Sequence, residues 1–127
     1  MPETIIDASA LLALLNSETG ADIVAEAIPK GVISAVNLSE VVTKLVDAGM
    51  PEKVIRQALQ PLGLEIIPFD EAQAYEAGLL YGATQNVGLS LGDRACLGLA
   101  IILKAPALTA DRAWTKLKSG IEVKVIR

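Results

Sequence analysis

Four acidic residues occupy comparable places along this chain, each close to the expected start of a helix. Asp7 follows a short β-branched run, Glu40 lies early in an amphipathic segment, Asp93 precedes a long apolar run, and Asp111 follows a short apolar strand. In an open α/β sheet, ligands bind outside the carboxyl ends of the strands, because the connecting loops converge there. We therefore expect these four acids, distant in sequence, to share one edge of the sheet.

Each acid taken alone also has a simpler interpretation as a helix cap. Asp7 and Asp111 can each be a plain N-cap. The segments NLSE at 37–40 and SLGD at 90–93 match the spacing of a capping box, with the acid at the third position. Acids near helix N-termini also offset the helix dipole. Capping can explain any one of these acids. It does not explain why all four positions are acidic, because Ser, Thr and Asn also cap helices.

Four carboxylates brought together point to a bound cation. Crowded carboxylates raise one another's pKa, and a set of oxygen ligands suits Mg²⁺ or Mn²⁺. Two such ions, about 3.5–4 Å apart, can activate a water and stabilise the leaving oxygen at a phosphodiester. The chain contains no histidine, which excludes Ser-His and Cys-His nucleophile pairs and histidine metal sites. The sequence thus predicts a divalent-metal site in which Asp7, Glu40, Asp93 and Asp111 are both ligands and catalytic groups.

The elements that must position these acids alternate between strand and helix. Strands are expected at 4–6, 31–34, 64–67, 107–109 and 122–126. Helices are expected from residue 8, over 21–28, 36–48, 51–60, from a cap at Asp70 to about 82, over 95–103 and over 112–117. This alternation predicts an α/β domain with a mostly parallel central sheet of about five strands and helices on both faces.

For three of these helices the sequence also predicts which surface is buried or binds a partner. The helices over 36–48 and 51–60 should form a helical hairpin, and surplus apolar surface on that hairpin would be a partner site. Its first helix collects its apolar residues on one face: Leu38, Val41, Val42, Leu45 and Val46. In the helix that starts after Asp70, Tyr75, Leu79 and small residues are expected on the buried side.

Length and composition indicate the class of protein. With 127 residues, 52% of them hydrophobic, the chain is expected to be one globular domain over 1–127. No apolar run approaches the roughly 20 residues that span a bilayer, and the start lacks a basic segment typical of secretory signals. Cys96 is the only cysteine, so no disulfide forms within the chain and a reduced, cytoplasmic setting is expected, with no membrane partner.

The charge of the chain is unevenly distributed. The net charge is −4, which argues against a dedicated nucleic-acid coat protein. Residues 104–127 nevertheless carry six bases and two acids, so this tail, together with Arg94, can hold a phosphate backbone locally.

Four segments carry a family resemblance over nearly the whole chain. IIDASALLALL, SAVNLSEVV, LSLGDRACLGLA and LTADRAW resemble, in order and spacing, the four motif blocks of PIN-domain proteins, above all the VapC-type toxins of bacterial toxin–antitoxin pairs. The resemblance implies a metal-dependent endoribonuclease that cuts RNA such as transfer RNA, is usually homodimeric, and is inhibited by a VapB-type antitoxin. It assigns Asp7, Glu40, Asp93 and Asp111 to the acidic quartet. Ser9 and Thr109 match the small hydroxyl residues that support it.

Four other residues were weighed as functional candidates. Arg94 and Arg112 directly follow two of the acids and can contact RNA phosphate or an antitoxin carboxylate, although a solvated surface arginine is equally compatible with the sequence. Trp114 can stack on a base, but a core or interface tryptophan is the preferred interpretation. Cys96 lies in an apolar run and is expected to be a small core residue.

Two alternative functions remain open at this level. A receiver-like phosphoacceptor domain has a similar size and alternation, but it needs a paired acid after the first strand, where Asp7 is followed by Ala8 and Ser9. It also needs a lysine at the end of the fifth strand, whereas Lys124 lies inside the expected last strand. The other alternative is a catalytically silent PIN-like binding module.

Overall fold

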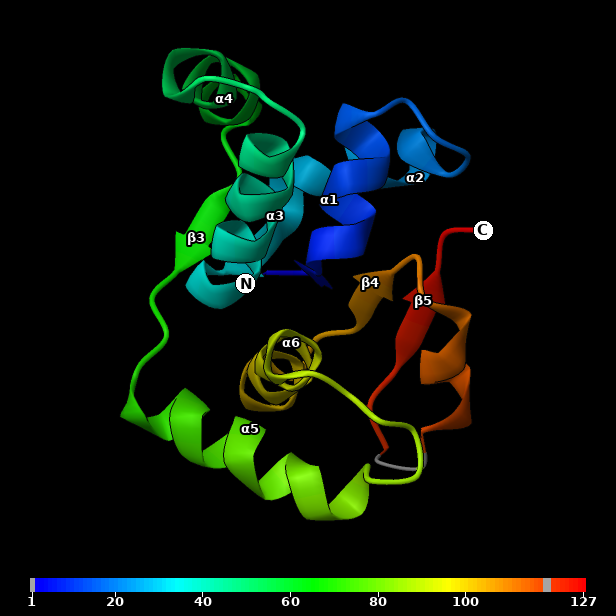
Figure 1. Cartoon of the computed structure of the whole chain (residues 1–127). Coiled ribbons are helices and arrows are strands. Elements are labelled where there is room, and N and C mark those ends of the chain that lie inside the picture. The colour runs from blue at the N-terminus through cyan, green and yellow to red at the C-terminus, as the bar shows by residue number, and fades with distance from the viewer. Residues whose placement is uncertain (1, 118–119) are drawn as a thin grey trace.

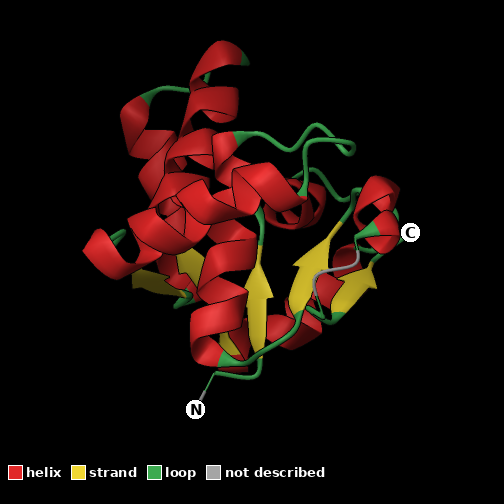
Figure 2. Ribbon diagram, turned by 90° about the horizontal axis from the view of Figure 1, so that it is seen from below, coloured by secondary structure: helices red, strands yellow, loops and turns green. Residues whose placement is uncertain are grey.

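A five-stranded parallel sheet forms the centre of the protein. The computed structural model describes residues 2–117 and 120–127. The strands are β1 (Thr4–Ile6), β2 (Gly31–Ser34), β3 (Glu65–Ile67), β4 (Ala107–Thr109) and β5 (Val123–Val125). They pair in the order β3-β2-β1-β4-β5, all parallel, and neighbouring arrowheads point the same way in Figure 2. The predicted α/β fold with a parallel sheet is confirmed.

The connections between the strands are helical. The α-helices are α1 (Ala8–Leu15), α2 (Ala21–Ala27), α3 (Ala35–Asp47), α4 (Glu52–Leu59), α5 (Glu71–Ala83) and α6 (Leu91–Leu103). Short 3₁₀ helices are η1 (Ile28–Lys30), η2 (Gln60–Leu62) and η3 (Arg112–Lys116). Within residues 2–117 and 120–127, none of these helices is long and apolar enough to cross a membrane.

The sheet separates two hydrophobic cores. Helices α1 to α4 cover one face, and α5 and α6 cover the other (Figure 1). Successive residues of a strand point to opposite faces. Ile6 accordingly packs with α1 and α3, whereas its neighbour Ile5 packs with α6, and both side chains are fully buried. Helices on both faces were predicted, and the structure confirms them.

The central position of β1 determines where the acids can meet. β1 lies between β2 and β4, and all three strands run parallel, so their carboxyl ends share one edge. Asp7 follows β1 directly, α3 begins directly after β2, and Asp111 lies two residues beyond β4. The topology therefore brings three chain segments that are far apart in sequence to a single edge.

The start of α3 differs from the sequence prediction. The helix begins at Ala35, and Ser34 is its N-cap, with the Ser34 hydroxyl accepting a hydrogen bond from the Val36 N–H at 3.2 Å. The capping-box alternative for residues 37–40 is therefore wrong, because the last residue of β2 already caps the helix. As a consequence Glu40 lies in the second turn of α3, not at its entry.

The buried side of α5 was also predicted wrongly. Tyr75 and Leu79 are 67% and 73% exposed, whereas Gln73, Ala77 and Leu80 face the interior. The reason is the close approach of α6: a Cβ atom placed on Gly98 would lie 3.2 Å from the Ala77 nitrogen. Helices this close need small side chains at the point of contact, where Ala77 meets Gly98, and Tyr75 and Leu79 lie on the opposite, exposed side of α5.

Candidate metal centre

Asp7 is the most deeply buried acid of the set. It is 4% exposed and forms the N-cap of α1, where its Oδ1 accepts a hydrogen bond from the Ala10 N–H at 2.8 Å. Two hydroxyl groups surround the same carboxylate. The Thr109 hydroxyl donates to Oδ2 at 2.6 Å, and Ser9 Oγ lies 2.8 and 2.9 Å from the two carboxylate oxygens. The side chain is thereby held in one orientation at the end of the central strand.

The two hydroxyl residues also connect the site to β4. Ser9 Oγ accepts from the Ala110 N–H at 2.9 Å, and Thr109 Oγ1 accepts from the Asp111 N–H at 3.0 Å. The network therefore joins the end of β1 to the segment that carries Asp111. The structure places Ser9 and Thr109 in direct contact with the first acid, as the family resemblance implied.

Burial makes the charged form of Asp7 costly. The pKa of this carboxyl is raised from 3.8 to about 6, mainly by desolvation and to a smaller extent by the negative charge of Asp93. The hydrogen bonds from Thr109, Ala10 and Ser9 favour the carboxylate and oppose this shift without cancelling it. The site thus contains a carboxylate that a nearby positive charge would stabilise.

Glu40 projects from α3 toward the start of α6. Its Oε1 accepts a hydrogen bond from the Asn37 side-chain amide at 2.9 Å. Its carboxylate lies against Gly92, so closely that a Cβ atom built on that glycine would overlap it. Glu40 therefore reaches the site from a different helix than the other acids.

Asp93 and Asp111 both bond to backbone at helix starts. Asp93 completes the predicted capping box of α6: the Ser90 N–H donates to Asp93 Oδ2 at 3.0 Å, and the Asp93 N–H donates to Ser90 Oγ at 3.1 Å. Asp111 is the N-cap of η3 and accepts from the Ala113 N–H at 2.9 Å. These two acids and Asp7 therefore cap helix starts, as the simpler interpretation predicted. Capping alone does not describe them, because all three also line one cavity.

All four acids line a single cavity. The cavity has a volume of about 210 Å³ and is lined by Asp7, Ala8, Ser9, Leu12, Asn37, Glu40, Lys44, Asp93 and Asp111. The charges act on one another across it, since Asp93 raises the pKa of Asp7. Burial raises the pKa of the Cys96 thiol well above its ordinary value, and the charges of Asp7, Asp93 and Glu40 raise it further.

The donor set of this cavity fits a hard divalent cation. All candidate ligands are oxygens, the preference of Mg²⁺ and Mn²⁺. Among the described residues, no lysine or arginine forms an ion pair with any of the four acids. In the same part of the chain, no group of three or more His, Cys, Asp or Glu side chains is arranged so that it could hold a metal ion in the present conformation. Three of the carboxylates each accept a hydrogen bond from a backbone N–H at a helix start, and all four acids line the cavity.

The two predicted arginines lie in different surroundings. The Arg94 guanidinium donates to the Ala77 carbonyl oxygen at 3.0 Å and lies 5.4 Å from the centre of the Tyr81 ring, so it packs on α5. Arg112 is exposed, and its Nε donates to the Arg127 carbonyl oxygen at 2.8 Å. Neither arginine lines the cavity.

Trp114 and Cys96 are core residues. Trp114 is 1% exposed and Cys96 is fully buried, and both belong to the core on the α6 face of the sheet. The preferred interpretation of each is confirmed, and base stacking by Trp114 is not supported, because a buried ring cannot reach a nucleotide.

The sequence analysis missed two residues of the cavity, Asn37 and Lys44. Both lie on α3, three residues before and four residues after Glu40, and so share its helix face. The signal was present in the sequence as polar residues at helical spacing around an acid. It was obscured because Asn37 was interpreted as part of a capping box.

Comparison with known proteins identifies the family. The model of the PIN domain family matches residues 4–119. Similar solved structures include a toxin–antitoxin complex from Klebsiella pneumoniae (24% identity, 98% of each chain covered, TM-score 0.75) and DNA-bound VapBC from Salmonella typhimurium (16%, 100% of each chain, 0.79). VapBC-5 from Mycobacterium tuberculosis is similar at 21% identity over 99% of each chain, with a TM-score of 0.64.

These structural likenesses agree with the observed fold. A search of curated protein sequences found no significant match. The strand order also differs from the 2-1-3-4-5 order of flavodoxin-like receivers, which removes support from the phosphoacceptor alternative. Since the family model covers most of the chain and the sheet has the expected parallel topology, this protein belongs to the PIN-domain family.

Proposed function

We propose that this protein is a metal-dependent endoribonuclease, the toxin component of a VapBC-type toxin–antitoxin pair, acting in the cytoplasm. The observation that carries the proposal is the single cavity lined by four carboxylates that have no basic partner among the described residues. Membership of the PIN-domain family supports a nuclease. The similar structures from Klebsiella pneumoniae and Salmonella typhimurium are toxin–antitoxin assemblies, which supports the toxin role.

The roles of the acids follow from their positions. A bound Mg²⁺ or Mn²⁺ would lower the pKa of a water and stabilise negative charge on a phosphodiester. Asp7 and Asp93 would be the central ligands of such an ion, and Ser9 and Thr109 would hold the Asp7 carboxylate in place for it. Glu40 would bind the metal or orient the attacking water, and Asp111 would complete a second, weaker site.

The cavity also offers a contact for the RNA backbone. Lys44 is exposed and lines the cavity one helical turn beyond Glu40, so its ammonium group can bind a phosphate next to the cleaved bond. Arg112 remains a candidate for a more distant phosphate or for an antitoxin carboxylate. Arg94 would first have to leave its contacts with α5.

Cleavage of RNA by the purified full chain tests the proposal. A structured RNA such as transfer RNA is incubated with Mg²⁺, Mn²⁺ or EDTA, and products are resolved on a denaturing gel. We expect metal-dependent cleavage that leaves 5′-phosphate and 3′-hydroxyl ends, and its loss in Asp93→Asn. Asp70→Asn is the matched control, because Asp70 caps α5 through the Gln73 N–H but lies outside the cavity. Metal binding without cleavage of any RNA would instead favour a catalytically silent binding module.

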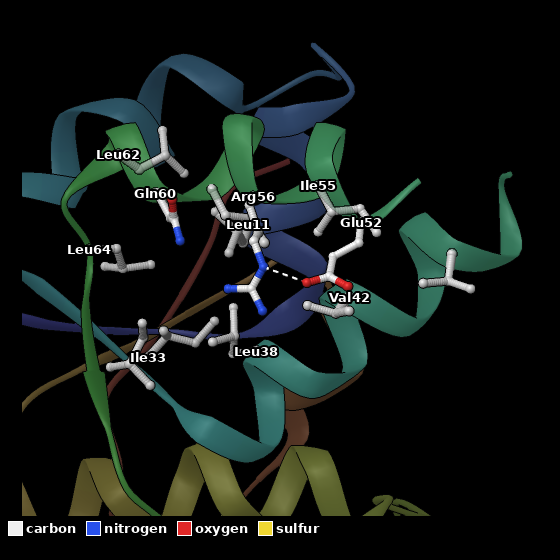
Figure 3. Close-up of a pocket in the computed structure, with 13 residues that line it drawn as sticks. Leu11, Ile33, Leu38, Val42, Glu52, Ile55, Arg56, Gln60, Leu62 and Leu64 are labelled. Atoms are coloured by element: carbon white, nitrogen blue, oxygen red, sulfur yellow. Dashed lines mark hydrogen bonds and ion pairs between the residues drawn. The ribbon is translucent and has the colours of Figure 1, made fainter. Parts of the chain in front are cut away.

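A separate groove is the proposed docking site of the antitoxin. It lies between α3, α4 and β3, has a volume of about 690 Å³, and its apolar side chains converge in Figure 3. Leu38, Val42 and Ile55 are among its lining residues, and the Glu52–Arg56 ion pair at 2.8 Å lies among the apolar side chains. The helical hairpin thus carries the surplus apolar surface that the sequence analysis associated with a partner.

Substitution in the groove tests this docking site. An apolar segment of a VapB-type antitoxin would bury the Val42 side chain, so Val42→Asp should abolish co-purification with the antitoxin while RNA cleavage by the isolated protein is retained. Val54→Asp on the same hairpin is the control, because Val54 is 42% exposed and does not line the groove. Equal antitoxin binding by both variants would contradict the assignment.

We also propose that the protein is a homodimer. Tyr75 and Leu79 lie one turn apart on α5 and expose 67% and 73% of their area, an unusual amount for large apolar residues. Burial of this surface against a second copy would explain it. Light scattering after size-exclusion chromatography should give the mass of a dimer for the wild type and of a monomer for Leu79→Lys.

A further inference from the structure

The Asn37 side chain connects the two helices that carry Glu40 and Asp93. It is 1% exposed and lines the carboxylate cavity. Its Nδ2 donates one hydrogen bond to Glu40 Oε1 at 2.9 Å and another to the Gly92 carbonyl oxygen, also at 2.9 Å. A single amide thus joins α3 to the first turn of α6.

The orientation of this amide follows from its two neighbours. A carboxylate and a carbonyl can only accept hydrogen bonds, so the two protons of Nδ2 must face them. Oδ1 is therefore directed elsewhere, and within the described residues no donor bonds to this buried oxygen. A buried acceptor without a donor is costly in a folded protein. On the wall of a cavity that is proposed to hold a cation, this oxygen can accept a hydrogen bond from a water.

Gly92 provides the space that the Glu40 carboxylate occupies. A Cβ atom on Gly92 would overlap both carboxylate oxygens of Glu40. The atoms it would meet are the flexible end of a side chain, not backbone. An alanine at this position would therefore displace the carboxylate and leave the two helices where they are.

We propose that Asn37 and Gly92 are positioning residues that hold the Glu40 carboxylate in the metal centre. Asn37 fixes the carboxylate by a hydrogen bond from one side, and the absence of a side chain at Gly92 allows it to lie against α6 on the other. Neither residue is assigned a part in the chemistry itself. The inference rests on the proposed metal-dependent function and explains how an acid in the second turn of α3 reaches the other three.

Calorimetric titration of the purified full chain with Mn²⁺ tests the inference. Asn37→Ala and Gly92→Ala should each weaken Mn²⁺ binding about 10- to 100-fold, the usual effect of removing an outer partner of a metal ligand. RNA cleavage should show a lower kcat with little change in KM. Gly92→Ala should not lower the melting temperature, because alanine is a better helix former than glycine.

Two controls separate positioning from a general structural role. Gln73→Ala removes another buried amide, whose Nε2 donates to the Pro68 carbonyl oxygen at 2.7 Å and whose Oε1 is also without a donor, but which is remote from the cavity. Gly78→Ala fills open space on α5. Both should bind Mn²⁺ like the wild type.

A double-mutant cycle shows whether the two residues act through Glu40. In a Glu40→Ala background, neither Asn37→Ala nor Gly92→Ala should weaken Mn²⁺ binding further, because the group they position is gone. Equal, additive losses in that background would overturn the inference. So would wild-type affinity in both single variants. A wild-type protein that binds no Mn²⁺ would instead overturn the proposed metal site itself, and this inference with it.

Discussion

Replacement of Asp7 by asparagine should make the metal-free protein more stable at neutral pH. Asp7 is 4% exposed, and burial raises its pKa from 3.8 to about 6. The folded protein therefore favours the protonated carboxyl, while at pH 7 the group is ionised in both the folded and the unfolded state. An ionised carboxylate in this position opposes folding unless a cation compensates it.

The direction of the pH dependence follows from proton binding. Between the ordinary pKa near 3.8 and the raised value of about 6, the folded state binds more protons than the unfolded state. The free energy of unfolding therefore falls as the pH rises through this window and levels off above it. A shift of about 2 pKa units corresponds to about 2.7 kcal/mol. Asparagine carries no charge but loses about 0.5–1.5 kcal/mol for a hydrogen bond it cannot accept, so the net gain is about 1–2 kcal/mol.

Thermal unfolding in EDTA measures this gain. At pH 7.5, Asp7→Asn should melt about 4–8 °C above the wild type, using about 4 °C per kcal/mol for a domain of this size. At pH 4 the two proteins should melt close together, because Asp7 is then largely protonated when folded. Asp70→Asn, at the exposed N-cap of α5, is the control and should show no such pH-dependent gain. Excess Mn²⁺ should reverse the order, because the ion stabilises only the wild type.

Two results would refute this reasoning. One is a lower melting temperature of Asp7→Asn than of the wild type at pH 7.5 without metal. The other is a gain of the same size at pH 4 and pH 7.5, which would show that packing and not charge is responsible.

Three further predictions concern the same site and the core beneath it. Asp93→Asn should abolish RNA cleavage and keep its far-UV circular dichroism, because asparagine can still accept the bond from the Ser90 N–H; comparable cleavage by the variant would contradict the site. Mn²⁺ at about 100 times its Kd should stabilise the wild type by about 2.7 kcal/mol, and an unchanged melting curve at millimolar Mn²⁺ would count against an ion site. Thr109→Val removes the donor 2.6 Å from Asp7 Oδ2, so the pKa of Asp7 should rise above about 6 and stability should fall by about 1–3 kcal/mol, measured by urea unfolding across pH.

The sequence alone determined the architecture and the membership of the acidic set. Short β-branched runs alternate with helical patterns, and such alternation allows little besides a parallel sheet with helices on both faces. The acids Asp7, Asp93 and Asp111 lie where strands end or helices begin, so their convergence on one edge followed from topology. The motif blocks around them pointed to the same family that the full-chain comparison identified.

Which side of a helix packs against a neighbouring helix was decided only by the tertiary structure. Tyr75 and Leu79 have the hydrophobicity of core residues, but the structure packs α5 on α6 through Ala77 and Leu80 and leaves Tyr75 and Leu79 exposed. Local pattern cannot reveal this, because the distance between two helices is set by residues remote in sequence.

The fold likewise decided which residues contact the Glu40 carboxylate and hold it in place. Asn37 and Gly92 are 55 residues apart, and the sequence pointed to the acids Glu40 and Asp93 in their segments but not to these two neutral residues. Their joint contact with Glu40 exists because α3 leaves β2 at Ala35 and crosses the start of α6. Local sequence specifies which residues are acidic and which helices form, whereas the packing of those helices decides which neutral residues hold the acids in place.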